Sequence, residues 1–404
     1  MGLPVFFLFP GFDLVSFLTG FLNFYALYLA ISLSLNLEFG YAGIPNFGKV
    51  LFIAGGAAVS GSVSGRIAAA VLNVNTHGNF IVFNTGIITQ VDGLLPSHFS
   101  LVALLFALSL AIGAGVGGLF GFISSYPAIR LREDYLGMLL LGVAQFWQVI
   151  MRTYEPLTGG AQNIDVPDPY FAWISLGTGY RDLVAAAVVS VFAICVFVYA
   201  ERVARSPLGR TLKAVRENED AARSLGKDDA AIRRNILIVS SAIAGMAGAI
   251  FTFYIASVEY DTWTRFAWTF WPFLIVIIGG AGNNVGVAVG TFFFALLFKG
   301  LQQIQPYVQP YIFFDANWLQ DLLFAGLLIA IMMLRPDGIL REKSAPTLSK
   351  RKISAIIGSG GVGAVVPTAG AGEPVKASTM MKLKEWLWRS RWSRPASDRD
   401  SPNV

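Results

Sequence analysis

Cysteine and histidine are almost absent from the sequence. Its 404 residues include one cysteine and two histidines, and a lone cysteine cannot form an intrachain disulfide. Cys195 lies within an apolar run, where we expect a small packed side chain. His77 and His98 lie in one polar stretch without the further ligands that a zinc site requires. The composition therefore excludes a disulfide scaffold and offers no metal centre.

Charged residues are also scarce. They make up 14% of the chain, whereas apolar residues make up 55% and the mean hydropathy is +0.60. A soluble globular protein carries about a quarter charged residues, so the composition excludes that class. It predicts an all-α, polytopic integral membrane protein with about 8–10 transmembrane helices, some of them broken by glycine and proline.

The apolar residues gather in segments that are candidates for membrane spans. The first of these segments has 24 residues without a charge, which is long enough to cross a bilayer as a helix. The segments lie near residues 14–37, 47–72, 101–123, 135–151, 183–200, 236–256, 266–280, 285–301 and 318–334. They predict about nine spans.

Lysine and arginine are unevenly distributed between the loops. None occurs in the first 48 residues, in 73–100 or in 302–318, whereas residues 201–235 hold nine basic and six acidic residues. The chain from Arg335 onward holds thirteen basic and six acidic residues. Positive residues stay on the cytoplasmic side, and alternating spans place every basic segment on one side. We therefore expect a multi-pass protein of the plasma membrane with its N-terminus outside, no signal peptide, and its C-terminus in the cytoplasm.

The chain divides into a transmembrane domain over residues 1–340 and a cytoplasmic tail over 341–404. Within the domain, we expect a cytoplasmic loop at 201–235 and an extracytoplasmic loop at 73–100. The tail is rich in glycine, alanine, serine and proline over 344–378 and then alternates tryptophan with basic residues. This pattern predicts disorder, followed by a segment that can lie on membrane lipid. Because the formal charge of +5 is concentrated on the cytoplasmic side, we expect no nucleic-acid partner.

The stretch GYAGIPNFGKV, residues 40–50, is one residue short of a phosphate-binding loop. Val50 stands where such a loop needs a hydroxyl for magnesium, and a membrane span precedes it in place of a buried strand, so we expect no ATP binding. Glycines and Pro45 instead predict unwound backbone, which at membrane depth must lie against protein or a water-filled cavity. A second cluster interrupts a corresponding position in the later half of the chain, and its members are Gly279, Gly280, Gly282, Gly286 and Gly290.

Paired interruptions of this kind in two halves of a membrane protein predict a translocation pathway. The residues that we assign to it are Gly40, Gly43, Pro45, Asn46, Gly48, Gly279, Gly280 and Gly282. The alternative is that glycines let helices pack closely, which explains Gly286 and Gly290 well.

The loop from Arg205 to Asn235 predicts a charged helix. Ser206 is suited to cap this helix, Pro207 to open it, and Gly226 to end it in a left-handed turn. Four residues at helical spacing form a narrow apolar stripe: Leu212, Val215, Ala222 and Leu225. The stripe is too small to build a domain but can dock into a groove on a partner. The alternative is an ordinary charged connector between two spans.

The same loop resembles the E-A-A-x-x-x-G signature of permease subunits of ABC importers. Asp220, Ala221, Ala222 and Gly226 occupy the signature positions, with Asp in place of Glu. The longer string RSPLGRTLKAVRENEDAARSLG is similar to the branched-chain amino-acid permease family, the LivM type. Further landmarks in family order are GYAG, PAIRLREDYLGMLLLG, LTGG and IIGGAGNNVGVAVG, so that the resemblance extends over roughly residues 21–340.

The resemblance implies a permease that is not an enzyme and holds no cofactor, since partner subunits consume the ATP. Two permease subunits, alike or different, would form the path, and two ATPase subunits would dock on their cytoplasmic loops. An extracytoplasmic binding protein would deliver leucine, isoleucine or valine, with urea and short amides as family variants. The residues assigned to ATPase coupling are Glu217, Asp220, Ala221, Ala222, Leu225 and Gly226.

Two other functional classes remain open. An ion-coupled secondary transporter of a small neutral or zwitterionic solute usually places ionisable residues within its spans. The interiors near 101–123, 183–200, 236–256 and 266–280 contain none, and Lys49, Arg66 and Lys299 can all lie near span ends. A passive channel or scaffold leaves the docking loop unexplained.

Overall fold

A computed structural model describes residues 14–76, 78–131, 133–171, 178–311, 315–335 and 337–342. These residues belong to the first of two compact units of the chain, Met1–Ser344. The predicted disordered stretch at 344–378 and the tryptophan-rich segment after it lie outside the described residues.

Helices make up most of the described residues, as the composition predicts. The elements are α2 (Leu14–Leu35), the π-helix η1 (Asn36–Tyr41), α3 (Lys49–Val71), α4 (Asn84–Leu94), η2 (Leu95–Ser97), α5 (Phe99–Arg130), α6 (Glu133–Thr153), α7 (Glu155–Thr158), η3 (Gly160–Gln162), β1 (Ile164–Asp165), α8 (Thr178–Arg205), α9 (Pro207–Glu217), α10 (Glu219–Ser224), α11 (Asp229–Ile255), β2 (Ser257–Val258), the π-helix η5 (Phe266–Phe270), α12 (Trp271–Gly279), α13 (Asn284–Val308), η6 (Gln309–Tyr311) and α14 (Ala316–Leu334). The two short strands pair antiparallel, with Ile164 opposite Val258.

Every predicted span corresponds to an apolar helix. In the part of the chain that the structure describes, seven helices are long and apolar enough to cross a membrane, and Phe266–Gly279 and Trp318–Leu334 are shorter apolar helices. Some helices are longer than the apolar runs from which they were predicted. The run 101–123, for example, lies within α5, which continues through Pro127 to Arg130. An apolar run ends at the first polar residues, whereas a helix ends where its backbone hydrogen bonds end.

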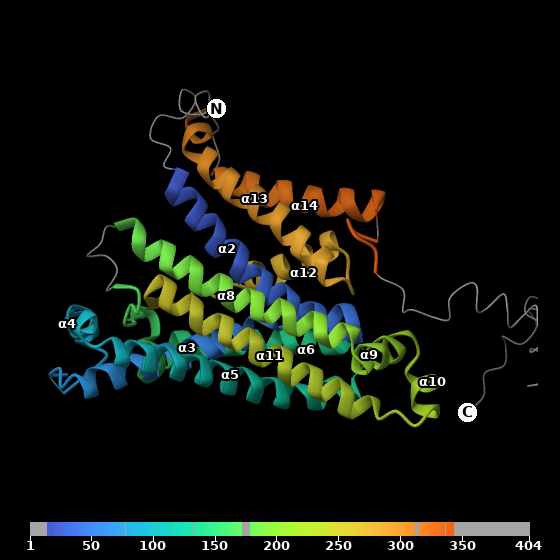
Figure 1. Cartoon of the computed structure of the whole chain (residues 1–404), viewed down its shortest axis with the longest axis horizontal. Coiled ribbons are helices and arrows are strands. Elements are labelled where there is room, and N and C mark those ends of the chain that lie inside the picture. Colours follow the sequence, from blue (N-terminus) through green and yellow to red (C-terminus); the bar gives the residue numbers. More distant parts are fainter. Residues whose placement is uncertain are drawn as a thin grey trace, which may run out of the picture. The chain divides into compact units, whose positions relative to one another are not determined.

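Glycines allow α11 to pack closely against α5 and α3 (Figure 1). A Cβ atom at Gly113 of α5 would lie 2.7 Å from the carbonyl oxygen of Gly245 on α11. A Cβ atom at Gly56 of α3 would lie 2.6 Å from the Cα atom of the same Gly245. Small residues at helix contacts are usual in membranes, because lipid is as apolar as the side chains and close backbone packing must supply the attraction.

Large apolar side chains cover the outer surface of the bundle. Leu119, Met138, Ile194 and Leu322 are each more than half exposed, and they come from four different helices. So much apolar surface is expected to face lipid. Cys195 is also exposed, so the expectation of a packed side chain is wrong. The apolar run around it did not distinguish the core from a surface in contact with lipid.

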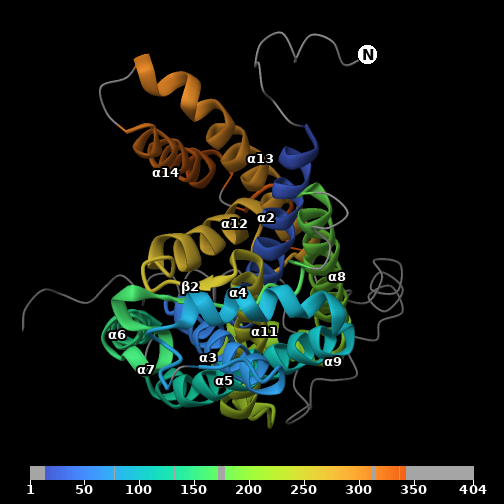
Figure 2. The ribbon, with the colours of Figure 1, turned by 90° about the vertical axis from the view of Figure 1, so that its left-hand side faces the viewer.

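The loops gather at two ends of the bundle. Helix α4 lies at one end, and α9 and α10 lie at the other (Figure 1). Figure 2 looks onto the α4 end, where Asn84 of α4 donates to the carbonyl oxygen of Asp165 in β1 at 3.3 Å. The predicted loops 73–100 and 201–235, one without lysine or arginine and the other rich in both, therefore lie at opposite ends.

Candidate functional site

The chain unwinds between α2 and α3, where the first interruption is predicted. The π-helix η1 follows α2, residues 43–46 have no regular structure, and α3 begins at Lys49. Gly43 has a φ of 71°, a left-handed conformation that favours glycine. A Cβ atom at Gly48 would lie 2.8 Å from the carbonyl oxygen of Leu140 on α6. We call residues 42–48 the broken-helix loop.

A buried ion pair fixes this loop. The Nζ atom of Lys49 lies 3.2 Å from Oε1 of Glu38, and both side chains are fully buried. Asn46 donates through Nδ2 to Oε2 of Glu38 at 2.9 Å. Lys49 also donates to the hydroxyl of Ser240 on α11 at 2.8 Å. The carboxylate of Glu38 therefore ties the residues on both sides of the loop to each other, and the lysine ties them to α11.

Sequence reasoning did not identify this pair. Glu38 directly follows the uncharged run, and Lys49 was expected only to lie near the end of a span. Lys49 is indeed the first residue of α3, but it is enclosed completely. The sequence pattern that could have indicated the pair is a glutamate and a lysine that lie eleven residues apart, one on each side of the glycine and proline break. A buried charge needs a partner of opposite sign, so these two residues were candidates to pair.

The second interruption, between α12 and α13, lies directly against the first. Asn36 of η1 accepts a hydrogen bond from the backbone N–H of Gly282 at 2.9 Å and donates to Oδ1 of Asn284 at 3.0 Å. Gly280 and Gly282 both have positive φ, 109° and 77°. A Cβ atom at Gly40 would lie 2.5 Å from the Gly282 nitrogen. The fold thus joins the two interruptions, although 246 residues separate Asn36 from Gly282.

Only some of the predicted pathway residues lie in this packed contact: Gly40 lies against Gly282, whereas Gly48 lies against Leu140 of α6 and Gly43 against Arg216 of α9. Asn46 is fully buried and Pro45 is partly buried. Gly279 lies against α13, where a Cβ atom at Gly290 would come within 2.8 Å of its Cα atom, so close packing explains these two glycines. The contact holds the broken segments together, and their assignment to a translocation pathway stays a prediction.

The chain after α14 returns to the same contact. Ile339 donates its backbone N–H to the carbonyl oxygen of Ile278 at 2.8 Å, and Leu340 donates to that of Gly279 at 3.1 Å. We call residues 338–342 the C-terminal strap. These bonds satisfy carbonyl groups at the end of α12, which would otherwise lack partners.

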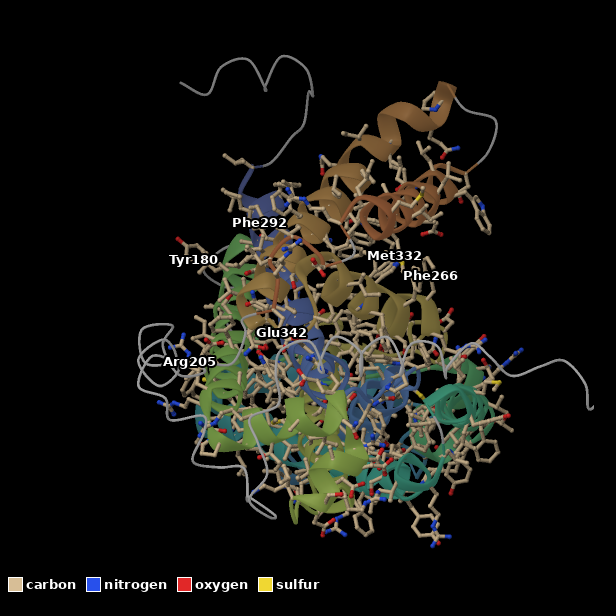
Figure 3. The ribbon with its side chains drawn as sticks, turned by 90° about the vertical axis from the view of Figure 1, so that its right-hand side faces the viewer. Tyr180, Arg205, Phe266, Phe292, Met332 and Glu342 are labelled. Carbon is tan, nitrogen blue, oxygen red and sulfur yellow. The ribbon has the colours of Figure 1, made fainter. Side chains whose placement is uncertain are left out.

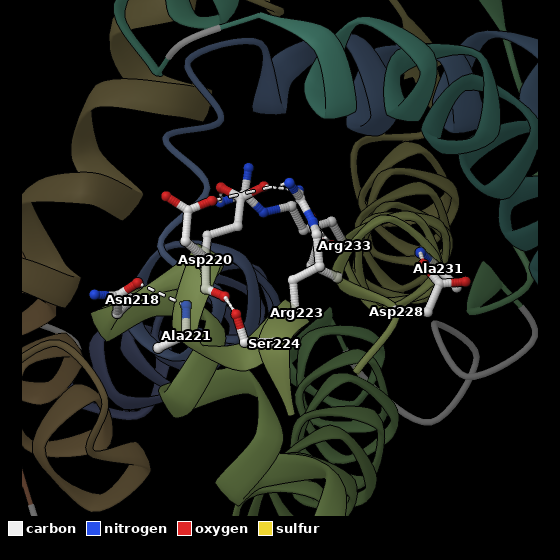
Figure 4. Close-up of polar contacts among 10 residues, drawn as sticks. Asn218, Asp220, Ala221, Arg223, Ser224, Asp228, Ala231 and Arg233 are labelled. Carbon is white, nitrogen blue, oxygen red and sulfur yellow. Dashed lines mark hydrogen bonds and ion pairs between the residues drawn. The ribbon is translucent and has the colours of Figure 1, made fainter. Parts of the chain in front are cut away.

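The loop between α8 and α11 forms two helices, so the prediction of one helix is wrong. Ser206 caps α9 as expected, by accepting a hydrogen bond from the backbone N–H of Gly209. Asn218 then adopts an extended conformation, with φ −158° and ψ 104°, and accepts from the N–H of Ala221 at 2.9 Å to cap α10 (Figure 4). The helix breaks there because an asparagine side chain competes for backbone donors and favours a cap over a helix interior.

The predicted apolar stripe is divided by this break. Leu212, Val215 and Ala222 are buried against the chain itself, whereas Leu225 is 80% exposed. The expectation that the whole stripe faces a partner is therefore wrong. Five of the six residues assigned to ATPase coupling are exposed: Glu217, Asp220, Ala221, Leu225 and Gly226. We call these five residues the α10 surface.

The end of α10 is the predicted left-handed turn. Gly226 has a φ of 75°, and the N–H of Lys227 bonds to the carbonyl oxygen of Ala222 at 3.2 Å. Ion pairs then fix α10 on the start of α11. Arg223 lies 2.9 Å from Oδ2 of Asp229, and Arg233 of α11 lies 2.9 Å from Oε2 of Glu219 (Figure 4). These ion pairs attach α10 to α11.

Arg216 of α9 joins this loop to the interruptions and to the strap. Its guanidinium donates through Nη1 to the carbonyl oxygen of Gly40, and its Nη2 lies 2.7 Å from Oε2 of Glu342. Lys213 lies 2.8 Å from the other oxygen of Glu342. Figure 3 looks onto this end of the bundle and labels Glu342. Burial disfavours the charge on Glu342, but hydrogen bonds from Lys213 and Arg216 outweigh it and lower the pKa of its carboxyl.

At the α4 end, acidic side chains gather around one arginine. Oδ1 of Asp92 accepts from the backbone N–H of Asp168 at 2.9 Å, and Arg181 lies 2.5 Å from Oδ2 of Asp168. Burial raises the pKa of Asp92 from 3.8 to about 7, and the charges of Asp168 and Asp165 add to this effect against the opposing Asp168 N–H and Arg181. The group thus titrates near neutral pH.

Metal ligands do not cluster in the described part of the chain. No group of three or more histidine, cysteine, aspartate or glutamate side chains in the described ranges could hold a metal ion. His98 is exposed at the start of α5, and His77 lies outside the described residues.

Comparison with known proteins gives a consistent family assignment. Residues 17–332 match the family model described as the branched-chain amino acid transport system permease component. The chain is 35% identical over 350 residues to the probable branched-chain amino acid transport permease protein LivM of Methanocaldococcus jannaschii, covering 86% of this chain and 99% of that protein. It is 28% identical over 258 residues to the high-affinity branched-chain amino acid transport system permease protein LivM of Salmonella typhimurium, covering 57% of this chain and 56% of that protein. No solved structure matches the chain.

Replacing Lys49 by Met should destabilise the fold by about 3–5 kcal/mol, because it leaves the carboxylate of Glu38 buried without a cation. We expect a lower apparent unfolding temperature of the purified protein in detergent. Lys227→Met, at an exposed lysine of the loop after α10, is the control and should change little. The double variant Glu38→Gln/Lys49→Met should recover part of the loss. Equal unfolding temperatures for the two lysine variants would contradict a structural role of the pair.

Asp92 should contribute a pH dependence to stability. Its carboxyl binds a proton in the folded state up to about pH 7, whereas the unfolded chain releases that proton near pH 3.8. The folded state therefore loses stability as the pH rises through this interval and changes no further above it. Asp92→Asn keeps the acceptor for the Asp168 N–H and should flatten this slope. The measurement is the apparent unfolding temperature at about pH 5 and about pH 8, and an unchanged slope would refute the assignment.

Proposed function

This chain belongs to the family of permease components of branched-chain amino acid transport systems, and we propose that it forms, with a second permease subunit, the path by which such an amino acid crosses the membrane. The family match over residues 17–332 is the observation that carries the proposal. The chain is a multi-pass membrane protein whose family performs transport. Leucine, isoleucine or valine is the proposed solute, because the relatives are named for branched-chain amino acids.

The α10 surface supports docking of an ATPase subunit. It displays an apolar side chain, Leu225, among charged residues, and ion pairs attach α10 to α11. A small apolar contact surrounded by charges suits a docking element, since the apolar contact supplies affinity and the charges supply orientation. One ATPase subunit on each of two permease subunits would consume the ATP, so that this chain needs no cofactor of its own.

The distribution of basic residues supports an orientation with the α9–α10 end in the cytoplasm. That end carries the loop 201–235 and the C-terminal strap, whereas the α4 end has the loop 73–100 without lysine or arginine. In this orientation the N-terminus lies outside and the C-terminus inside the plasma membrane. The α4 end would then face an extracytoplasmic solute-binding protein.

Arg216 offers a route by which movement of a docked ATPase reaches the path. Its guanidinium binds the carbonyl oxygen of Gly40 in η1 and the carboxylate of Glu342 in the strap, so a shift of α9 would either move η1 and the strap or break these contacts. A Cβ atom at Gly43 would lie 2.8 Å from Cγ of Arg216, so the side chain lies directly against the loop. ATP binding changes the permease only if contacts differ between its two states, and these contacts are candidates for that difference.

The buried pair of Glu38 and Lys49 is the one observation that favours an ion-coupled secondary transporter, because such carriers use ionisable residues within the membrane. Both oxygens of Glu38 have partners, however, and Lys49 has a third partner in Ser240. A fully satisfied pair is suited to a structural role. Uptake into proteoliposomes that requires ATP and persists without an ion gradient would reject the secondary-transporter alternative.

Leu225→Arg should weaken association with the ATPase subunit at least about tenfold, since it places a long charged side chain in the proposed apolar contact. The measurement is co-purification of the ATPase with each permease variant. Val82→Arg is a matched control, because Val82 is exposed at the α4 end and is expected to have no effect. Ala222 is unsuitable, since it is buried and its replacement would disturb the fold. If the Leu225→Arg variant co-purified with as much ATPase as the unaltered permease, the loop would be an ordinary connector between two spans and not a docking element.

Arg216→Gln should uncouple ATP hydrolysis from uptake. The variant loses charged hydrogen bonds to Gly40 and Glu342, each of about 1.5–3 kcal/mol, so we expect uptake per ATP hydrolysed to fall about tenfold or more. Arg210→Gln, at an exposed arginine of the same helix, should keep the normal ratio. The assay measures solute uptake and ATP hydrolysis in the same proteoliposomes. An unchanged ratio for Arg216→Gln, with the complex intact, would eliminate this route.

A further inference from the structure

A groove of 570 Å³ lies between α6, the segment around η5 and the broken-helix loop. Its size falls within the range of about 300–1,000 Å³ that is usual for small-molecule sites. The residues on which the following argument depends are Phe47, Gln145, Gln148, Arg265, Phe270 and Phe273. None of the glycines assigned to the pathway from the sequence lines this groove.

One wall of the groove is aromatic. The rings of Phe47 and Phe273 stack with centroids 4.9 Å apart, and Phe270 stacks on Phe266 at 5.1 Å. Phe47 and Phe266 are each about two-fifths exposed, and Figure 3 labels Phe266. These rings leave an apolar surface that is partly exposed.

The part of the lining that α6 supplies includes two polar, uncharged side chains. Gln145 donates to Oε1 of Gln148 at 3.2 Å, and Gln148 donates to the carbonyl oxygen of Tyr260 at 3.4 Å. Each amide has two donor hydrogens and an acceptor oxygen, so both can bind a further polar group. Arg265 is the one charged residue that lines the groove among the described residues, and it is exposed.

The groove is built on interrupted helices. Its η5 wall is a π-helix, an irregularity that is frequent at functional sites. Thr269 of η5 accepts a hydrogen bond from the N–H of Val50 at 3.0 Å, which joins this wall to the start of α3. Phe47 belongs to the broken-helix loop, and Arg216 lies against Gly43 near the other end of the same loop. A shift of α9 would therefore reach the groove through a single loop.

We infer that this groove binds the transported amino acid, an inference that rests on the proposed function. The apolar side chain of the solute lies on the rings of Phe47, Phe270 and Phe273. Its ammonium group donates to the amide oxygens of Gln145 and Gln148, and its carboxylate faces Arg265. A solute with an acidic side chain would place that carboxylate on the aromatic wall without a partner, which costs free energy. The groove therefore favours a zwitterion with an apolar side chain over one with an acidic side chain.

The first test measures uptake of radiolabelled L-leucine by the permease–ATPase complex in proteoliposomes. Gln148→Leu removes polar contacts to the solute and should raise KM about three- to tenfold. Gln302→Leu, at an exposed glutamine of α13 away from the groove, is the matched control and should leave KM unchanged. Co-purified ATPase and the unfolding temperature of each variant show that the complex is intact.

The second test measures selectivity, which a purely structural role would not alter. Phe270→Ala widens the aromatic wall and should increase uptake of L-phenylalanine relative to L-leucine about tenfold, as expected when an apolar pocket gains volume. Misfolding would lower the uptake of both amino acids, so it cannot explain an increase in L-phenylalanine uptake.

An unchanged KM for Gln148→Leu together with unchanged selectivity for Phe270→Ala would overturn the inference and make the groove a packing surface. Absence of L-leucine uptake by the unaltered complex would instead reject the proposed solute. The two failures are distinguishable, because the second is seen without any substitution.

Discussion

The buried ion pair between Glu38 and Lys49 is the interaction on which the rest of this site depends. Breaking a membrane helix exposes backbone groups that lipid cannot satisfy, so the break must be enclosed and fixed by protein. Glu38 fixes it by binding Lys49 and Asn46 at once, and Lys49 extends the attachment to α11 through Ser240. A charge pair at this depth is costly unless every partner is present. The direction in which α3 leaves the break is therefore set by electrostatics and hydrogen bonds.

The position of the break decides what the other elements can reach. Because η1 lies beside the turn between α12 and α13, Asn36 can bind Gly282 of the later half. Because Arg216 of α9 also reaches η1, it contacts Gly40 and the C-terminal strap together. One small region thus joins the first broken helix, the second interruption, the loop between α8 and α11 and the C-terminal strap. Such a region is suited to transmit movement between these elements, because each of its polar contacts has a defined partner.

Several features of the site were predictable from the sequence because they depend on local chemistry. Ser206 caps a helix, Gly226 ends one in a left-handed turn, and glycines around residue 43 unwind a span, each for reasons that involve only a few neighbouring residues. Asn218 shows the limit of such reasoning. An asparagine inside a charged, otherwise helical stretch is compatible with both a helix interior and a cap, and the competing choices differ by only about 1 kcal/mol.

The sequence by itself determined the membrane class, the apolar helices, the two interruptions and the family, because hydropathy, span length and the family motifs are all properties of the linear chain. The tertiary structure decided which side chains serve the site. It buried Ala222 and exposed Leu225, paired Glu38 with Lys49, and placed Phe47 opposite α6. The physical reason is that burial and pairing depend on contacts between segments far apart in the chain, and helical periodicity contains no information about which distant segment will arrive on which face.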